Sequence, residues 1–293
     1  MQTTGALIAA FGAAAAFAVS NVAEMRASRR TQVRRRIDPG LLARLARDKQ
    51  WLAGFGASFM GYALQATALA LAPVVLVQPV IVTELLFALP LAAFLAGFRL
   101  GRREWLGAGL VAAGLAAFLL VARPSGESTS APFTVWTMVI GGVAAAVALL
   151  AAASAMLARG PMVRASLLAA AASVCFGLMS VLTKSLVHLF AADRLGALTR
   201  PQPWLLAGTA AAGLLLAQTA FRTAPLAVCL PLIDLGEPLV ASLIAVFAFG
   251  EKIGRGSAIL GGVLAATVIV ATGVAVLDTA PAVRAAQRRI DPG

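Results

Sequence analysis

Nine long apolar runs, separated by short polar segments, divide the chain from one end to the other. They lie at about 5–24, 51–71, 74–98, 104–122, 134–158, 165–189, 204–221, 225–250 and 256–277. A helix needs roughly 17–25 residues to cross the ~30 Å hydrocarbon core of a bilayer. Because lipid offers no hydrogen bonds to the backbone, each run must satisfy its own peptide groups. The pattern therefore predicts nine transmembrane helices.

The composition places the whole chain in the membrane class. It is 60% hydrophobic and 12% charged, with a mean hydropathy of +0.90. The longest polar connection, Met25–Gln50, is too short for an independent domain. We therefore expect an all-α, polytopic membrane bundle over 1–293 with no soluble module. Its predicted parts are a first half (1–122), a connecting helix (134–158), a second half (165–277) and a cytoplasmic tail (278–293).

The basic residues gather on alternate connections, and this assigns an orientation. The net charge is +12, and eighteen of the 24 Lys and Arg residues fall in segments that share one side. The positive-inside rule then predicts an N-terminus outside and a cytoplasmic C-terminus. Five basic residues lie on the other side and Lys184 lies within a helix. The inner set is Arg26, Arg29, Arg30, Arg34, Arg35, Arg36, Arg44, Arg47, Lys49, Arg99, Arg102, Arg103, Arg159, Arg164, Arg222, Arg284, Arg288 and Arg289.

Several functional classes are excluded by what the chain lacks. Nucleic-acid binding would need basic residues interleaved with aromatic ones, and no such pattern occurs. No Ser/His, Cys/His or metal-ligand constellation indicates an enzyme, and no cofactor is expected. Cys175 and Cys229 lie singly in apolar runs, which indicates neither a disulfide nor a metal site. Richness in Ala, Gly and Arg is typical of a high-GC bacterium, so we expect the protein in a bacterial plasma membrane. A homodimer is one possible assembly there.

An internal repeat organises the predicted helices. Shifting the sequence by 153 positions places Trp51 on Trp204, Gln65 on Gln218 and Glu84 on Glu237. More loosely, the stretch around Phe17 and Ser20 resembles the one around Phe176 and Ser180. Helices one to four then correspond to helices six to nine, with the fifth as a connector. Because the halves are five helices apart, they enter the membrane in opposite directions, an architecture typical of secondary transporters.

Two acidic residues at the middle of apolar runs are the main candidates for a functional site. Glu84 and Glu237 occupy equivalent depths in runs 74–98 and 225–250, and Asp234 lies three residues before Glu237 on the same helix face. Two carboxylates so close in an apolar medium do not both ionise readily, which suits proton coupling. The alternatives are a structural ion pair of Glu237 with Lys184 and a permanently protonated Glu237 bonded to Gln218.

Further polar residues and prolines accompany these acids. Gln65 and Gln218 either line a solute path or bond neighbouring helices. Lys184 either balances the acids or extends its ammonium group to the interface. Three prolines near the acids, Pro79, Pro231 and Pro238, predict helix breaks that expose backbone carbonyls; a kink that only fits the bundle is the alternative.

Two features of the second half form a recognisable pattern: the stretch from Phe221 to Ala241 (FRTAPLAVCLPLIDLGEPLVA), and Gly250-Glu251 before a Gly-rich last helix. In these features the second half resembles the drug/metabolite transporter (EamA-like) superfamily. The first half also resembles NIPA-type magnesium transporters, through Ala72-Pro73 to Pro79 and the basic segment after the first helix. The resemblance implies an inverted-repeat transporter. Members of the superfamily usually have ten helices where this chain shows nine, and the NIPA pattern has no acid at Glu84.

Three hypotheses for the function follow. The first is a secondary transporter that exchanges a small organic solute for protons through Glu84, Asp234 and Glu237. The second is a permease for magnesium or another divalent cation, which would use the same oxygens with the acids ionised. The third is a membrane scaffold without transport. The sequence also repeats Arg-Arg-Ile-Asp-Pro-Gly at 35–40 and 288–293, outside the 153-residue shift, with no physical explanation at this level.

Overall fold

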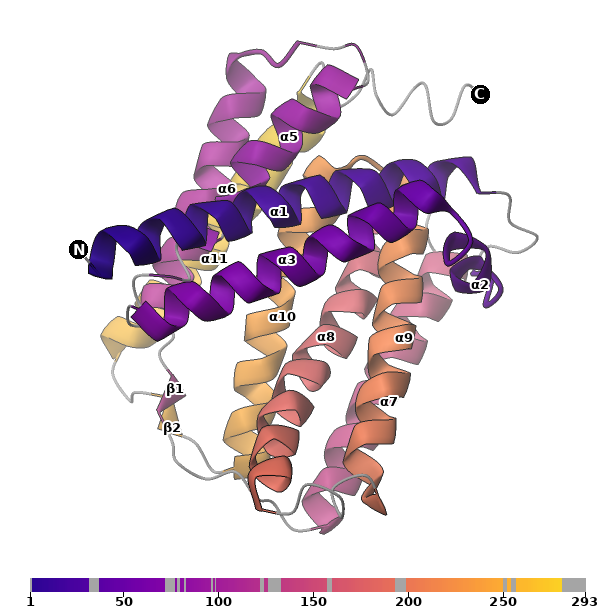
Figure 1. Cartoon of the computed structure of the whole chain (residues 1–293), viewed down its shortest axis with the longest axis vertical. Helices are drawn as coiled ribbons and strands as arrows, with labels where there is room; N and C mark the ends of the chain where they lie inside the picture. The colour runs from indigo at the N-terminus through magenta and orange to yellow at the C-terminus, as the bar shows by residue number, and fades with distance from the viewer. Residues whose placement is uncertain are drawn as a thin grey trace.

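The structure, a computed structural model, describes residues 2–31, 37–71, 77, 80–81, 83–95, 97, 99–121, 124–125, 133–156, 160–192, 199–249, 252–253 and 257–280. This part of the chain is helical apart from short connections and one antiparallel pair of two-residue strands (Figure 1). The elements are α1 (Gln2–Arg30), α2 (Leu41–Leu45), α3 (Lys49–Leu71), α5 (Glu84–Leu95), α6 (Arg102–Val121), β1 (Pro124–Ser125), α7 (Phe133–Met156), α8 (Pro161–Ala192), α9 (Pro201–Thr223), α10 (Leu226–Phe249), β2 (Lys252–Ile253) and α11 (Ser257–Thr279).

The all-α prediction is confirmed, and each apolar run of the sequence falls on a helix. Four helical segments are long and apolar enough to cross a membrane: Thr3–Arg30, Thr134–Met156, Pro161–Thr183 and Pro201–Thr223. Shorter apolar helices occupy Glu84–Leu95 and Gly261–Leu277. Much of the first part of the third run, including Pro79, lies outside the described residues. The structure is thus that of a helical protein with several helices suited to a membrane.

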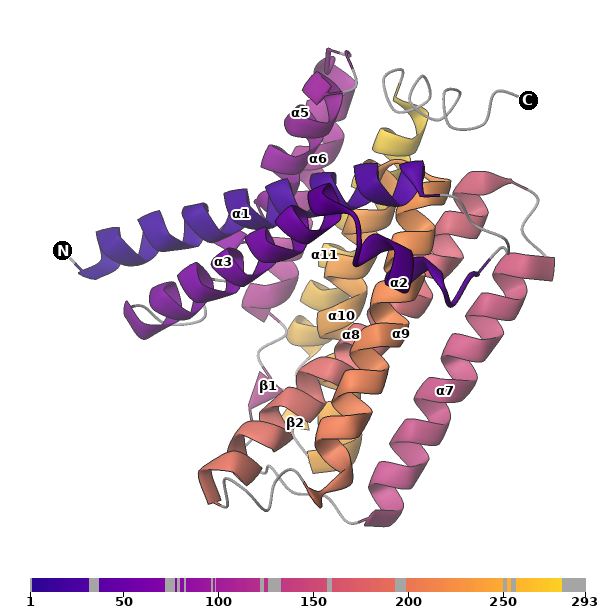
Figure 2. The same cartoon turned by 45° about the vertical axis from the view of Figure 1, so that its right-hand side comes forward.

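The helices pack as a group of four and two further pairs, and one of the pairs crosses the group of four. Helices α7, α8, α9 and α10 run side by side, while α1 and α3 pair with each other and lie steeply across the ends of that group (Figures 1 and 2). Helices α6 and α11 form a further close pair, and α5 packs on α1 (Figure 1). This crossing is not evident from hydropathy, because a hydropathy profile measures length and apolarity but not the angle between helices.

One buried core joins most of these elements. Its side chains come from α1, α5, α6, α8, α9, α10 and α11, and many of them are alanines. Small residues let helices approach closely where lipid provides no hydrophobic force to drive them together. Helix α7 stands apart, since it packs mainly on α8 and exposes Met138, Leu149 and Met156. An exposed apolar face on α7 fits contact with lipid.

Backbone contact between α6 and α11 depends on glycine. A Cβ at Gly273 in α11 would lie 2.8 Å from the backbone nitrogen of Val111 and 2.9 Å from the carbonyl oxygen of Gly107. Distances this short cannot be relieved by a side-chain rotation, because both neighbours are backbone atoms. Gly109, two residues from Gly107 on α6, has open space where its Cβ would stand.

We therefore expect Gly273→Ala to lower the free energy of unfolding by about 1–3 kcal/mol through overpacking. Gly109→Ala is the matched control: without a clash, it should leave stability unchanged or raise it by up to about 1 kcal/mol through helix propensity. Chemical unfolding in detergent, followed by circular dichroism, measures both. Equal effects of the two substitutions would contradict the α6–α11 contact.

Candidate functional site

Three carboxyl groups from two helices meet where α5 packs on α10. Glu84 stands at the first position of α5 and is 8% exposed, while Asp234 and Glu237 lie in α10 and are partly buried. The side chains of Glu84 and Asp234 face each other at hydrogen-bonding range. Glu237 lies close enough to interact electrostatically with both. The sequence pairs Asp234 with Glu237 along one helix, whereas the structure also joins it to the acid of the other half.

The contact between Glu84 and Asp234 has a chemical consequence. Ionised carboxylates only accept hydrogen bonds, so two of them share one only when one holds a proton. Oδ2 of Asp234 is buried without a partner among the described residues. A buried acceptor of this kind has a strong tendency to take up a donor or a proton. The pair therefore forms a site that can hold a proton between the two helices.

Glu237 is positioned by the neighbouring helix α8. Ser180 Oγ donates a hydrogen bond to Glu237 Oε1 over 2.6 Å. The two helices come close enough because of two glycines: a Cβ at Gly177 would lie 2.6 Å from that of Val240, and one at Gly236 would clash with the hydroxyl of Ser173. The alternative in which Gln218 bonds Glu237 is not found, because Gln218 bonds a different carboxylate.

The prolines of α10 do not interrupt its helical course. The helix is continuous from Leu226 to Phe249 through Pro231 and Pro238. Proline has no N–H, so these two residues donate no bond to the carbonyls of Ala227 and Asp234 one turn earlier. The predicted helix breaks at Pro231 and Pro238 are therefore absent: α10 lacks two backbone donors but stays continuous. Pro79 lies outside the described residues.

A further buried carboxylate, Glu24, lies apart from this cluster and was not predicted from the sequence. It is 6% exposed and accepts hydrogen bonds from Gln218 Nε2 and, at 3.1 Å, from Ser20 Oγ. Ser20 is also bonded to Ser58 of α3 at 2.6 Å, and Ser28 donates to the amide oxygen of Gln218. The network joins α1, α3 and α9 and satisfies both oxygens of the acid.

The reason that Glu24 was missed is the length of α1. The apolar run ends near residue 24, but the helix continues to Arg30, so Glu24 faces protein instead of the polar connection. The spacing of Ser20, Glu24 and Ser28 by four residues puts them on one helix face, and this was the available signal. Close packing completes the site, since a Cβ at Gly54 would lie 2.9 Å from that of Ala23.

The other predicted residues are more scattered. Gln65 lies on α3 and is partly exposed, and Lys184 belongs to α8, with its side chain outside the description. Tyr62 of α3 interacts electrostatically with Glu24, Glu84 and Glu237. It therefore lies within reach of both the Glu24 network and the cluster of Glu84, Asp234 and Glu237. Within the described ranges, no three His, Cys, Asp or Glu side chains are arranged to hold a metal ion.

We expect Gln218→Ala to lower the free energy of unfolding by about 1–3 kcal/mol, because it removes a donor from a buried carboxylate. Gln65→Ala, at the matching position of the other half, should cost much less. The double variant Glu24→Leu with Gln218→Leu should recover part of the loss, since it removes both partners of the bond. Thermal unfolding in detergent compares the three; equal losses in Gln218→Ala and Gln65→Ala would contradict the network.

Comparison with known proteins gives one clear relation. No family model matches the chain, and no solved structure matches it significantly. The chain is 30% identical over 204 residues to "Uncharacterized protein Cgl0250/cg0304" of Corynebacterium glutamicum, a match that covers 69% of this chain and 70% of that protein. An identity of this level over more than two thirds of both chains shows common descent. The chain therefore belongs to the same family as Cgl0250/cg0304 of Corynebacterium glutamicum.

Proposed function

We propose that this protein is a secondary active transporter that moves a small organic solute across the plasma membrane in exchange for protons. The observation that carries the proposal is the meeting of Glu84 with Asp234 and Glu237, which come from opposite halves of the sequence. Ionisable groups at membrane depth are costly and are functional by default. Three of them at one helix contact are more than packing requires.

The internal symmetry of the packing supports this reading. Helix α1 packs on α3 and α5, and its counterpart α8 packs on α9 and α10. Helix α5 contacts α6 as α10 contacts α11, while the α5–α10 and α6–α11 contacts join equivalent helices of the two halves. An inverted repeat with α7 as the connector would produce these pairings, so they support the proposal; the resemblance to drug/metabolite transporters implies an inverted repeat as well.

Individual contacts repeat as well. A Cβ at Gly61 of α3 would lie 2.6 Å from the ring of Phe17, and one at Gly213 of α9 would lie 2.7 Å from the ring of Phe176. The sequence pairs these two phenylalanines across the repeat. Each half thus seats an aromatic ring on a glycine of its second helix. The Glu84–Asp234 contact lies where the halves meet, as the substrate and coupling-ion sites of inverted-repeat transporters do.

The proposed mechanism uses the proton shared by the carboxyl groups. While α5 and α10 are in contact, Glu84 and Asp234 hold a proton between them. When one half rocks against the other, the two groups separate and the proton can leave to the side then open to water. Glu237, fixed by Ser180, supplies a third oxygen pair that a cationic or hydrogen-bonding solute can occupy once the proton has left.

We expect proteoliposomes that contain the protein to take up protons when a transported solute leaves along its gradient. A panel of organic cations and small metabolites, read with an entrapped pH-sensitive dye, identifies the solute. Glu84→Gln and Glu237→Gln should each reduce the coupled flux at least ten-fold, because the amide cannot exchange a proton.

The matched control is Glu104→Gln. Glu104 is also buried, but it accepts a bond from the backbone nitrogen of Gly101 at 2.9 Å, which an amide oxygen can accept equally well. Its flux should equal that of the unaltered protein. Magnesium uptake without proton movement would replace the proposal by a divalent-cation permease. Unchanged activity and growth in both cluster variants would indicate a scaffold without transport.

We also propose that the N-terminus lies outside and the C-terminus in the cytoplasm, on the distribution of Arg and Lys over the connections. A green fluorescent protein fused after Gly293 should then fluoresce, and alkaline phosphatase fused there should be inactive. Phosphatase fused after Arg200, at the opposite ends of the helices, should be active. Phosphatase activity after Gly293 would reverse the orientation.

A further inference from the structure

We propose that the ends of α2, α8 and α9 form a binding site for the phosphate group of an anionic phospholipid. Three arginines gather there: Arg44 in α2, Arg164 in the first turn of α8 and Arg222 in the last turn of α9. Arg222 interacts electrostatically with the other two and with Asp38. Among the described residues, the cluster holds three guanidinium groups and one carboxylate, and its charge is therefore positive.

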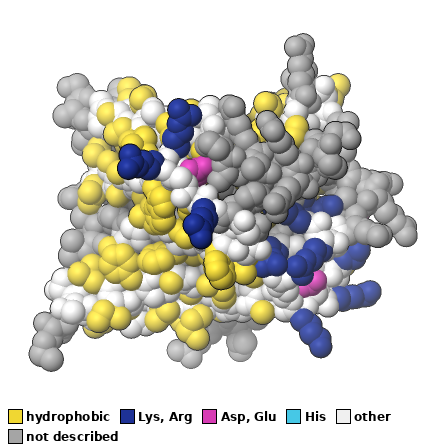
Figure 3. Space-filling model, turned by 90° about the horizontal axis from the view of Figure 1, so that it is seen from above, with side chains coloured by type: hydrophobic (Ala, Val, Ile, Leu, Met, Phe, Trp, Pro, Cys, Tyr) yellow, Lys and Arg dark blue, Asp and Glu magenta, His cyan; other side chains and the backbone are white. Residues whose placement is uncertain are grey.

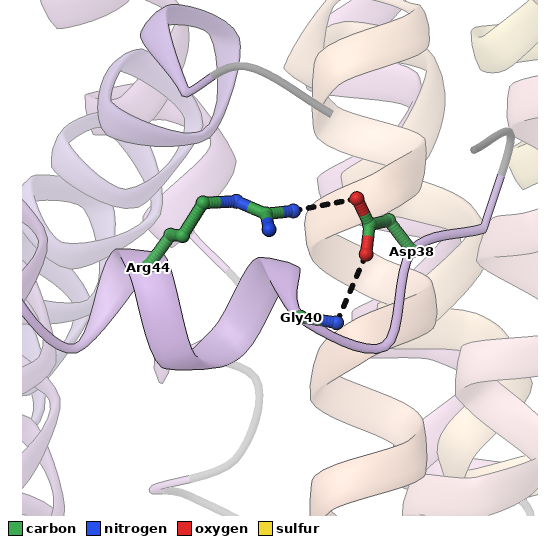
Figure 4. A network of polar contacts seen from close by, with 3 residues as sticks. All are labelled: Asp38, Gly40 and Arg44. Atoms are coloured by element: carbon green, nitrogen blue, oxygen red, sulfur yellow. Dashed lines mark hydrogen bonds and ion pairs between the residues drawn. The ribbon is translucent and has the colours of Figure 1, made fainter. Parts of the chain in front are cut away.

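The carboxylate in this cluster is already engaged. Asp38 Oδ2 accepts a bond from Arg44 Nη2 at 2.6 Å, and Oδ1 accepts one from the backbone nitrogen of Gly40 at 3.0 Å (Figure 4). The second of these bonds closes the turn that starts α2. This turn also explains the first Arg-Arg-Ile-Asp-Pro-Gly segment, whose described part is a helix start; the second copy lies outside the described residues. Asp38 is therefore committed to Arg44 and to the fold.

Donor groups at the cluster remain unused. The buried Nε atoms of Arg44 and Arg222 have no hydrogen-bond partner in the described part of the chain. A buried donor without a partner costs free energy, and a guanidinium presents its donors in the fork that a phosphate group matches. Arg29 provides a contrast, because it donates to the carbonyls of Phe221 and Ala224 at 2.9 and 2.8 Å. Arg29 closes the end of α9, whereas Arg222 beside it retains an unused donor.

The cluster is held in place by apolar packing. Leu41 and Leu45 of α2 are buried with Ala27 and Trp51, and they pack near Leu214 of α9. These contacts fix the short helix that carries Arg44 against the helix that carries Arg222. The helices that carry Arg44 and Arg222 are therefore already packed together before any ligand arrives.

Its surroundings favour a lipid over a dissolved phosphate ion. On the face seen from above, the Lys and Arg side chains gather mainly over the half where α2 lies (Figure 3). Val163, which precedes Arg164, is 54% exposed, and Met156 at the end of α7 is 82% exposed. Positive charge beside exposed apolar side chains matches a phospholipid, whose phosphate lies next to its acyl chains. Basic pockets between helix ends at the cytoplasmic surface bind headgroups in this way.

The test is a lipid titration of the full chain purified in neutral detergent, with the melting temperature as readout. Phosphatidylglycerol should stabilise the protein, while phosphatidylcholine and inorganic phosphate at equal concentration should not. Arg222→Gln and Arg44→Gln should each weaken the effect of phosphatidylglycerol about five- to ten-fold in concentration. Arg103→Gln is the matched control, because Arg103 is exposed at the start of another helix, and it should behave like the unaltered protein.

Asp38→Asn separates binding from folding. The amide oxygen still accepts the bond from Gly40, but the competing negative charge is gone, so phosphatidylglycerol should bind at least as tightly as before. Weaker binding in this variant would overturn the proposal, as would full stabilisation of Arg222→Gln by the lipid. Equal stabilisation by inorganic phosphate would also overturn it, in favour of a site for a dissolved anion.

Discussion

The need to satisfy buried polar groups determines how the helices of this protein meet. Glu24 brings α1 to α9 because its oxygens require the amide of Gln218 and the hydroxyl of Ser20. Glu84 brings α5 to α10 because it lies against Asp234. Apolar side chains are interchangeable partners in lipid, whereas a carboxyl group needs a specific donor or a proton. The acids therefore select which helices pair, and the alanine-rich core lets them come close.

Glycines make these polar contacts sterically feasible. Gly54 admits α1 next to Glu24, and Gly236 admits α8 close to the turn that carries Glu237. A side chain at either position would push the helices apart by more than a hydrogen bond of 2.6–3.1 Å tolerates. The glycine content of the chain is thus related to its chemistry, because the donors reach the acids only where backbones nearly touch.

The helix positions and the two acids in the middle of apolar runs were accessible from sequence, but the partners of these acids were not. Hydropathy places an apolar run to within a few residues, which was sufficient for α3, α6 and α9 but put Glu24 at the very end of the first run, although α1 continues to Arg30. Helical spacing pairs Asp234 with Glu237 on one face, yet the contact with Glu84 depends on how α5 and α10 lie against each other. Gln218 was expected either to line a solute path or to bond a neighbouring helix; it is buried and bonds Glu24 of α1, 194 positions away. Contacts of this range follow from three-dimensional packing and leave no local pattern in the sequence.

The arginines show the same distinction at the surface. The positive-inside rule treats Arg29 and Arg222 alike, because both lie at helix ends on one side. In the structure, Arg29 supplies the donors that the last carbonyls of α9 lack, a favourable position for a cation at the negative end of a helix. Arg222 is at that same end, where the carbonyls of Phe221 and Ala224 are already bonded and the nearby Asp38 accepts a hydrogen bond from Arg44. Two equal charges at the same helix end thus differ in what they can still bind: Arg29 is used by the carbonyls of α9, whereas Arg222 keeps a buried donor without a partner in the described part of the chain.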